Sequence, residues 1–372
     1  MLFGNEEALP FWIADIDMEV MPGLVETLQK VATSGVFGYE TRQDGLTKSL
    51  SGWFGRRHDM ALKEQMFLFT PSVLTSLSVI IESFTAKGEG IVIQPPVYQA
   101  FAQTIQGLNR RVVNNPLRFE DGQYRMDLED LVSRITREHP KIMLLCSPHN
   151  PVGRVWTKQE LLAIAHICIE HDVMMVSDEI HADIVFPEHQ FIGMSRIFDE
   201  LSTHFIMIGS SGKSFGIPGI VDSFIYTPER MLYKKLKFYI ESHHLHKCNA
   251  FTNAAVTYVY DEGDEWMDQF IHYLFENISL VQQFCNTELP ALNLIRAEGT
   301  YQVWLDFRGL KVDEPLLVKL LSQNAGVALN SGSSYGEEGT GFMRMNIGVT
   351  HDMLLDGLGR MKQALSKTKA AI

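Results

Sequence analysis

KIMLLCS (141–147), VMMVS (173–177) and HFIMIGS (204–210) are three apolar runs that decide the fold of this 372-residue chain. Runs of this length and composition are typical of strands that are buried on both faces of a parallel sheet. In an open α/β sheet, ligands bind beyond the carboxyl ends of the strands. The residues that directly follow these runs are therefore the first candidates for a functional site.

The segments around these runs extend the alternation of strand and helix. TKQELLAIAHICIEHD (157–172) predicts a helix, in which Thr157 and Glu160 have the spacing of a capping box. Segment 72–85 also predicts a helix, while 91–94 and 223–227 predict strands. This order predicts a doubly wound, mostly parallel α/β sheet, in a large domain that spans residues 40–275.

The two ends of the chain predict a smaller α+β domain, made of residues 1–39 and 276–372. Its expected strands are FWIAD (11–15), TYQVWLDF (300–307) and FMRMNIGV (342–349). Its expected helices are LVETLQKVA (24–32), a segment ending at Gly326 (315–326) and a closing helix (353–367). Beyond about residue 264, a stripe at helical spacing predicts a helix packed on the core: Trp266, Phe270, Tyr273, Leu274, Ile278 and Val281.

Composition excludes several classes of function. Asp and Glu number 45 against 32 Lys and Arg, so the net charge of −13 argues against a nucleic-acid or anionic-membrane surface. The four cysteines are widely spaced, which predicts neither a disulfide framework nor a zinc site. The N-terminus lacks the features of a signal peptide, and no run approaches the ~20 apolar residues of a membrane span. We therefore expect a cytoplasmic enzyme.

Three polar residues follow the three apolar runs: Asn150, Asp178 and Lys213. Because the carboxyl ends of parallel strands meet at one edge, we expect an amide, a carboxylate and an amine to converge there. Together they can orient, protonate and covalently hold an aromatic aldehyde cofactor. A lysine that is desolvated in such a place has a lowered pKa and becomes nucleophilic.

Each of these residues also has a simpler interpretation. Lys213 could be a solvated loop charge, Asn150 could cap a turn, and Asp178 could begin a helix or bind a metal. The GKS tripeptide at Lys213 is not a P-loop, because position 207, where that motif needs glycine, is Met207. The three histidines of ESHHLHK (241–247) are expected to form a solvated face of a helix, not a metal site.

Further candidates lie in other motifs. Val73 and Leu74 open a predicted helix, where free backbone N–H groups attract phosphate. Tyr98 is either a core aromatic or a flat face on which a ring can stack. Arg344 lies inside an apolar strand, where it either forms an internal salt bridge or binds a substrate carboxylate.

At these residues the chain resembles the fold-type-I enzymes that depend on pyridoxal 5′-phosphate (PLP), specifically the MalY/PatB group of carbon–sulfur β-lyases. Eight segments carry the resemblance in family order: ALPFWIADIDM (8–18), VFGYETRQDG (36–45), PPVYQAF (95–101), CSPHNPVGR (146–154), SDEIHAD (177–183), SSGKSFGIPG (210–219), GTYQVWLDF (299–307) and GEEGTGFMRMNIG (336–348). The resemblance implies the PLP-dependent transferase-like fold, type I, with a PLP cofactor and an amino-acid substrate.

The resemblance also implies a role for each matched residue. Lys213 would bind the cofactor covalently, Asp178 would hold its ring nitrogen, and Tyr98 would stack on the ring. Asn150 and His181 would lie near its phenolic oxygen, and Val73, Leu74 and Ser210 would bind its phosphate. Ala14 and Arg344 would line the pocket for the substrate carboxylate. Tyr39 would reach the phosphate of a neighbouring subunit, which implies a homodimer with shared sites.

Five positions depart from the family pattern. Ser72 stands where glycine is usual, Gly212 where serine is usual, and Gly216 where asparagine is common, while Gln99 and Ala100 replace a more usual sequence after the stacking tyrosine. The expected activity is cleavage of cystathionine, cysteine or cysteine S-conjugates to a thiol, pyruvate and ammonia. The alternatives are aminotransfer, which needs the same residues, and a PLP-bound regulatory protein acting through a protein partner.

Overall fold

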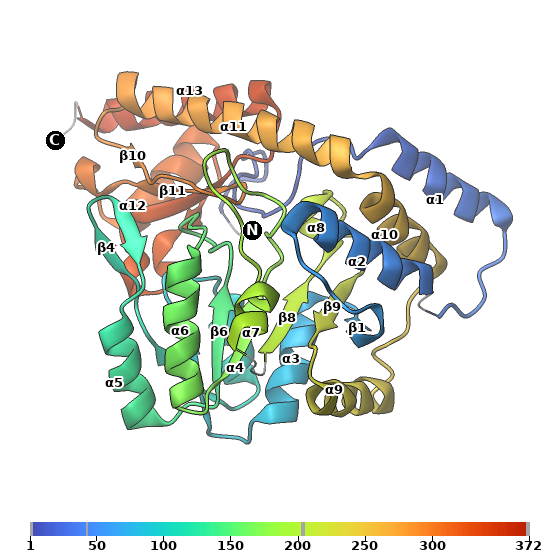
Figure 1. Cartoon of the computed structure of the whole chain (residues 1–372). Coiled ribbons are helices and arrows are strands. Elements are labelled where there is room, and N and C mark those ends of the chain that lie inside the picture. Colours follow the sequence, from blue (N-terminus) through green and yellow to red (C-terminus); the bar gives the residue numbers. More distant parts are fainter. Residues whose placement is uncertain (1–2, 42–43, 202–204, 370–372) are drawn as a thin grey trace.

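The computed structural model describes residues 3–41, 44–201 and 205–369 (Figure 1). Arg42 and Gln43 of the quoted segment 36–45, and His204 at the start of the third apolar run, lie outside these ranges. The elements form a large sheet with helices around it and a second, smaller sheet above one end of it (Figure 1).

The large sheet has seven strands in the order β1-β9-β8-β7-β6-β2-β3. Their bounds are β1 Phe67–Thr70, β2 Gly90–Ile93, β3 Arg111–Asn114, β6 Ile142–Cys146, β7 Met174–Asp178, β8 Phe205–Gly209 and β9 Ser223–Tyr226. Strand β9 alone runs opposite to the other six strands, which confirms the mostly parallel sheet. The three quoted runs form its central strands β6, β7 and β8, as predicted.

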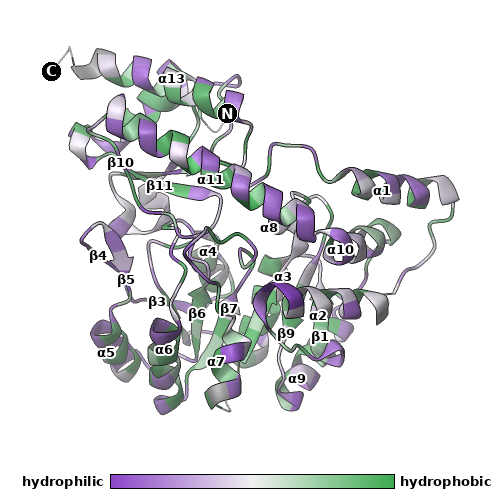
Figure 2. Ribbon diagram, turned by 45° about the horizontal axis from the view of Figure 1, so that its top comes forward, coloured by the Kyte–Doolittle hydropathy of each residue, from purple (hydrophilic) through white to green (hydrophobic). Residues whose placement is uncertain are grey.

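Helices cover both faces of this sheet because its strands are apolar on both faces. On β6, Ile142 and Leu144 face one core, while Met143 and Leu145 face the other. The first core is closed by helices α3 Val73–Phe84, α4 Ala100–Gly107 and α9 Arg230–Ser242. The second is closed by α2 Asp44–His58, α5 Leu128–Glu138, α6 Lys158–Glu170 and α7 Met194–Leu201. The hydropathy colouring shows the apolar strands between more polar helices (Figure 2).

The predicted helices of this region are confirmed with small changes in their bounds. Thr157 caps α6, and the capping box with Glu160 is present in both directions. The single-turn helix α8 Ser211–Ser214 and the longer α10 Ala250–Glu262 follow β8 and α9. A hairpin of β4 Arg118–Glu120 and β5 Gln123–Arg125 projects beside the sheet. The described part of the chain contains no helix that is long and apolar enough to span a membrane.

The second sheet is antiparallel, in the order β10-β11-β13-β12. Its strands are β10 Asn293–Leu294, β11 Gln302–Asp306, β12 Asn330–Ser331 and β13 Phe342–Asn346. The long helix α11 Asp264–Thr287 carries the predicted stripe and lies across the top of Figure 1 with α13 His351–Lys369. The division of the chain into domains at residues 40 and 275 stays a prediction.

Two expectations about secondary structure at the chain ends are wrong in detail. Helix α12 spans Glu314–Lys319 and then widens into a π-helical turn at Leu320–Ala325, although the end at Gly326 is as predicted. Helix α9 ends at Ser242, so the histidines of segment 243–246 lie in turns and not on a helix. No group of residues within the described ranges could hold a metal ion.

The predicted strand FWIAD (11–15) is also wrong, because the segment is irregular. Its carbonyl groups accept hydrogen bonds from side chains, so they are not available to a strand partner. The oxygen of Trp12 accepts from Asn330 Nδ2 at 2.8 Å, and that of Asp15 accepts from Asn346 Nδ2 at 2.7 Å. The helix predicted at 24–32 is present as α1 Pro22–Ser34 and extends away from the body on the right of Figure 1.

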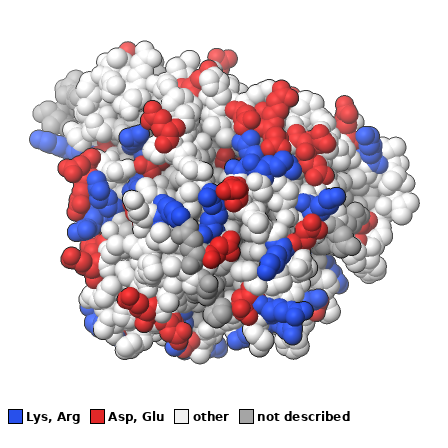
Figure 3. Space-filling view, in the orientation of Figure 1, with Lys and Arg blue, Asp and Glu red and all other residues white. Residues whose placement is uncertain are grey.

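The surface carries both signs of charge. On the face shown in Figure 3, Lys and Arg side chains are interspersed with Asp and Glu side chains. Many of these charges form exposed ion pairs, such as Arg360 with Asp356 at 2.7 Å. Such pairs contribute little to stability, because water already solvates both partners.

A buried ion pair joins the segment after β6 to the segment before β11. Glu298 accepts from Arg154 Nε at 2.8 Å, from the Val155 N–H at 2.8 Å and from Gln123 Nε2 at 2.7 Å. Arg154 also donates to Glu160, at 3.0 Å. Because Arg154 and Glu298 are buried, removing one of them leaves a buried charge with fewer partners.

We predict that Glu298→Ala lowers the free energy of unfolding by about 3 kcal/mol, because it leaves the buried Arg154 without this carboxylate. Asp356→Ala, which breaks the exposed pair with Arg360, should cost less than about 0.5 kcal/mol. Urea unfolding followed by circular dichroism measures both. Equal losses in the two variants would contradict the prediction.

Candidate active site

A cavity of about 350 Å³ lies beyond the carboxyl ends of the central strands. Asp178, the last residue of β7, is paired in register with Cys146 at the end of β6 and with Ile208 of β8. Nine of the predicted site residues line this cavity: Ala14, Val73, Leu74, Tyr98, Asn150, Asp178, His181, Ser210 and Lys213. The structure therefore brings together residues that the sequence places as far as 199 positions apart, as Lys213 and Ala14 are.

Lys213 reaches the cavity from the single-turn helix α8, which begins directly beyond β8. Ser210 caps this turn by accepting a hydrogen bond from the Gly212 N–H at 3.0 Å. The ammonium group of Lys213 donates to the carbonyl oxygen of Ala14. Burial lowers the pKa of Lys213, with Asp15 opposing this shift and Arg344 adding to it. Because its pKa is lowered, a larger fraction of Lys213 is present as the unprotonated, nucleophilic amine.

Asp178 is a buried carboxylate that forms no ion pair with any lysine, arginine or histidine in the described ranges. Its Oδ1 accepts one hydrogen bond, from the Ile180 N–H at 3.1 Å. Burial raises the pKa of Asp178 to about 7, and this hydrogen bond opposes the shift. A ligand with a protonated ring nitrogen would supply the missing partner and stabilise the ionised carboxylate.

Arg344, on β13 of the second sheet, is a buried cation without a carboxylate partner within the described ranges. Its Nη2 donates to the carbonyl oxygen of Trp12 at 2.7 Å, and its Nη1 donates to Asn150 Oδ1 at 3.3 Å. Nε has no partner among the residues that the structure describes. The alternative of an internal salt bridge is therefore wrong, and the guanidinium is available to an anionic ligand.

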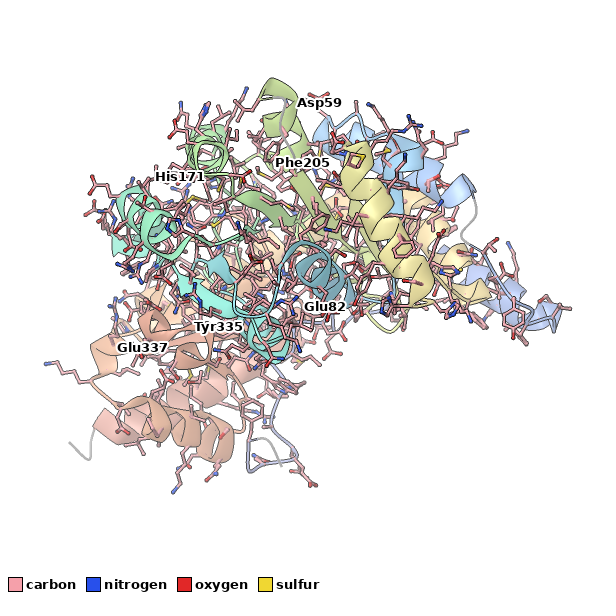
Figure 4. The ribbon with its side chains drawn as sticks, turned by 90° about the horizontal axis from the view of Figure 1, so that it is seen from below. Asp59, Glu82, His171, Phe205, Tyr335 and Glu337 are labelled. Carbon is pink, nitrogen blue, oxygen red and sulfur yellow. The ribbon has the colours of Figure 1, made fainter. Side chains whose placement is uncertain are left out.

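The aromatic Tyr335 lies against this guanidinium. Its ring centroid is 5.3 Å from the guanidinium carbon of Arg344, and its hydroxyl accepts from Asn330 Nδ2 at 3.0 Å. Tyr335, labelled in Figure 4, lies on the loop between β12 and β13, and its carbonyl accepts from the Val97 N–H at 3.0 Å. This loop therefore places the Arg344 side chain next to the segment that carries Tyr98.

His181 is a buried imidazole at the floor of the cavity. Burial, together with the nearby charges of Lys213 and Arg344, lowers its pKa to about 3, so the ring is neutral at physiological pH. Its Nδ1 has no partner in the described part of the chain. Tyr98 lines the same cavity and lies edge-on to Phe101 at 5.8 Å, which leaves a ring face for a ligand.

One end of the cavity is suited to a phosphate group. Helix α3 begins at Val73, and its first main-chain N–H groups are free of helical partners. Ser72 caps this helix, with its hydroxyl accepting from the Thr75 N–H at 3.2 Å. Both Ser72 and Ser210 line the cavity there. The hydroxyl groups of Ser72 and Ser210, together with the N-terminus of α3, form an anion site that contains no arginine from the described residues.

Two of the departures from the family pattern have local explanations. Gly216 has a φ of +66°, a left-handed conformation that asparagine also tolerates, so either residue fits. A side chain at Gly212 would place its Cβ 3.2 Å from Cα of Pro218, so serine would require this segment to shift slightly. Nothing in the structure explains the replacement at Gln99 and Ala100.

Sequence reasoning missed several residues that also line the cavity: Cys146, Ile180, Pro218, Ile220, Val221 and Asp222. Cys146 could have been found, because it lies near the end of a predicted strand, four residues before Asn150. Ile220 and Val221 follow the lysine motif with no polar group to single them out. Tyr39 does not line this cavity and is fully exposed, so its role toward a second subunit stays a prediction.

The residues present fit PLP. A buried carboxylate needs a cationic nitrogen, a helix start and two hydroxyls are suited to a phosphate, and a lysine of lowered pKa is available to an aldehyde. The open ring face of Tyr98 is suited to stacking. Arg344 remains available for the carboxylate of an amino acid.

We predict that Asp178 and Glu179 make the ligand-free protein less stable as the pH rises from about 4 to 8. Burial raises the pKa of Asp178 to about 7 and that of Glu179 to about 8, so the folded protein holds these protons more tightly than the unfolded chain. The stability that they contribute is therefore lost as the pH rises through these values. Asp178→Asn removes one of the two titrations, so its thermal midpoint should fall less steeply with pH. Calorimetry of both cofactor-stripped proteins measures this, and equal slopes would contradict the prediction.

Comparison with known proteins agrees with this geometry. The chain is 34% identical over 365 residues to cystathionine β-lyase PatB of Bacillus subtilis, covering 98% of this chain and 94% of that protein. It is 33% identical to the protein MalY of Escherichia coli, covering 98% and 93% of the two chains. Among solved structures, a PLP-bound putative aminotransferase from Clostridium difficile superposes with a TM-score of 0.95 at 35% identity, covering 98% of this chain and 94% of the other.

The family model for aminotransferase class I and II matches residues 13–361, which include every residue of the cavity. The high TM-score shows that the fold seen here is similar to that of the structure from Clostridium difficile. This chain therefore belongs to the aminotransferase class I and II family.

Proposed function

We propose that this protein is a PLP-dependent carbon–sulfur β-lyase, which cleaves cystathionine, cysteine or cysteine S-conjugates to a thiol, pyruvate and ammonia. The observation that carries the proposal is the convergence of Lys213 and Asp178 on one cavity, with Arg344 bonded to Asn150 in its wall. The similarity to a cystathionine β-lyase over nearly the whole chain supports the choice of reaction.

The residues of the cavity would hold the cofactor at four places. Lys213 would bind its aldehyde, and the Asp178 carboxylate would pair with its ring nitrogen. Tyr98 would stack on the ring, and Asn150 with His181 would lie near its phenolic oxygen. The start of α3 at Val73 and Leu74, together with Ser210, would bind the phosphate. When bound, PLP supplies an electron sink that stabilises negative charge on the α-carbon of an amino acid.

Arg344 binds the α-carboxylate of the substrate, because it is a buried cation that lacks an acidic partner. The carbonyl of Trp12 and the side chain of Asn150 hold the guanidinium in place. The irregular segment of Ala14 lies on the same side of the cavity. This grip fixes which bond at the α-carbon faces Lys213.

Lys213 then acts as the base. Its Nζ accepts the proton of the substrate α-carbon, which its lowered pKa favours. The bond between the β-carbon and sulfur breaks, and the sulfur leaves as a thiolate, which takes the proton from Lys213 to give the thiol. The remaining three-carbon fragment takes up water and gives pyruvate and ammonia. With PLP bound, the Asp178 carboxylate would hold the ring nitrogen in its protonated form.

We also propose that the protein works in the cytoplasm as a homodimer, in which Tyr39 of one subunit approaches the cofactor phosphate of the other. The exposed side chains of Val36, Phe37 and Tyr39 support this, because apolar and aromatic groups in one segment favour burial against a partner. Leu74 and Val221, which line the cavity, are also exposed although they are apolar, as expected of residues that a partner subunit covers.

Aminotransfer is the second candidate, because the solved structure from Clostridium difficile is described as that of an aminotransferase. The same lysine, aspartate and arginine serve both reactions. The two differ in what happens after proton removal: loss of the β-substituent, or return of the proton to the cofactor.

We predict that the purified protein releases pyruvate and a free thiol from cystathionine without any added keto acid, because the reaction needs no second substrate. Coupled assays for pyruvate and thiol measure the two products. Lys213→Ala should release neither, because it lacks both the amine that binds the cofactor and the base. Turnover only in the presence of a keto acid would contradict the lyase and favour aminotransfer.

A further inference from the structure

A second buried polar cluster adjoins the lysine turn, and none of its residues lines the cavity. The carboxylate of Asp183 accepts three side-chain hydrogen bonds. Trp53 Nε1 donates at 2.8 Å, Ser214 Oγ donates at 2.5 Å, and His58 Nε2 lies at 2.6 Å. Ser214 directly follows Lys213 in α8, so the cluster is connected to the residue that binds the cofactor.

All four members of this cluster are buried. Burial on its own raises the pKa of Asp183, but the hydrogen bond and charge of His58, with the bonds from Ser214 and Trp53, lower it below its ordinary value. The carboxylate is thus ionised and bonded through both oxygens. A buried carboxylate with three donors has a well-defined position, because losing any one bond leaves a desolvated oxygen unsatisfied.

Helix α8 needs an anchor of this kind. It has four residues, which is too short for a helix to be stable by itself. Its cavity side is occupied by Lys213, which must be free to change partners. Its other side is held by Ser214 and by Phe215, whose ring packs edge-on to Trp53 at 5.2 Å and to Tyr260 at 5.8 Å.

Trp53 and His58 come from α2, so the anchor joins two elements that are distant in sequence. The His58 ring also packs against Phe54 and Phe191, at 5.5 and 5.2 Å, which restricts its orientation. The carboxylate of Asp183 is therefore fixed from the α2 side and in turn fixes Ser214.

We propose that Asp183 is a positioning residue, which holds the main chain of Lys213 in place through Ser214 while the lysine side chain moves. This inference rests on the proposed role of Lys213. The lysine amine has two targets, the cofactor aldehyde and the substrate α-carbon, and reaching both requires a fixed main chain. A displacement of about 1 Å in a reacting group can lower a rate by roughly a hundredfold.

The test is Ser214→Ala, which removes the one bond between the cluster and the lysine turn and leaves Asp183 bonded to Trp53 and His58. Two quantities are measured. The first is the rate at which cofactor-stripped protein captures PLP, followed by absorbance and by borohydride trapping with mass spectrometry of Lys213. The second is kcat and KM for thiol release from cystathionine. We expect both the capture rate and kcat to fall roughly tenfold, with KM changed less than about twofold.

Thr85→Val is the matched control. It also removes a partly buried hydroxyl, which accepts a hydrogen bond from Arg110 Nε at 2.9 Å. Thr85 lies at the C-terminal end of α3, whereas the cavity lies at the N-terminal end of this helix. Thermal unfolding of both variants shows whether their losses of stability are comparable. The control should capture PLP and turn over at the wild-type rate.

Ser214→Ala rates within twofold of the wild type, or a decrease no larger than that of Thr85→Val, would overturn the inference. If borohydride traps PLP on Lys213 of the wild-type protein, a Ser214→Ala variant with wild-type rates overturns this inference alone and leaves the proposed function intact. If borohydride labels no Lys213 in the wild type, the proposed function and this inference both fail.

Discussion

The site depends on two buried charges that lack a counter-ion among the residues that the structure describes. Asp178 lies at the end of β7, and burial raises its pKa to about 7. Arg344 lies on β13 and has a free Nε. An uncompensated buried charge is costly, so each is expected to be completed by a ligand. The two together specify a cationic nitrogen and a carboxylate, which a PLP cofactor and an amino-acid substrate would provide.

The rest of the fold positions these two charges. The parallel strands β6, β7 and β8 place Asn150, Asp178 and Lys213 at one edge of the large sheet. The antiparallel sheet contributes Arg344, and the buried pair of Arg154 and Glu298 joins the segments that lead to the two sheets. The N-terminal segment completes the site with main-chain carbonyls, which bind the side chains of Lys213 and Arg344.

Much of this arrangement could be predicted, because local features of the sequence decide it. Buried strands need long apolar runs, and functional residues of such sheets follow the strand ends, so Asn150, Asp178 and Lys213 could be selected. The segment 11–15 could not be predicted correctly, because its carbonyl partners Asn330 and Asn346 lie more than 300 residues away. The cluster of Asp183 could not be seen either, because Trp53 is 130 positions distant from it. Apolar lining residues such as Ile220 have no chemistry that distinguishes them from the core.

The most direct test of the account is a crystal structure of the protein grown with PLP. We predict continuous electron density between Lys213 Nζ and the aldehyde carbon of the cofactor, with a carboxylate oxygen of Asp178 within hydrogen-bond distance of the ring nitrogen. A cofactor bound without contact to Asp178, or an empty cavity beside a Lys213 that stays bonded to Ala14, would contradict it.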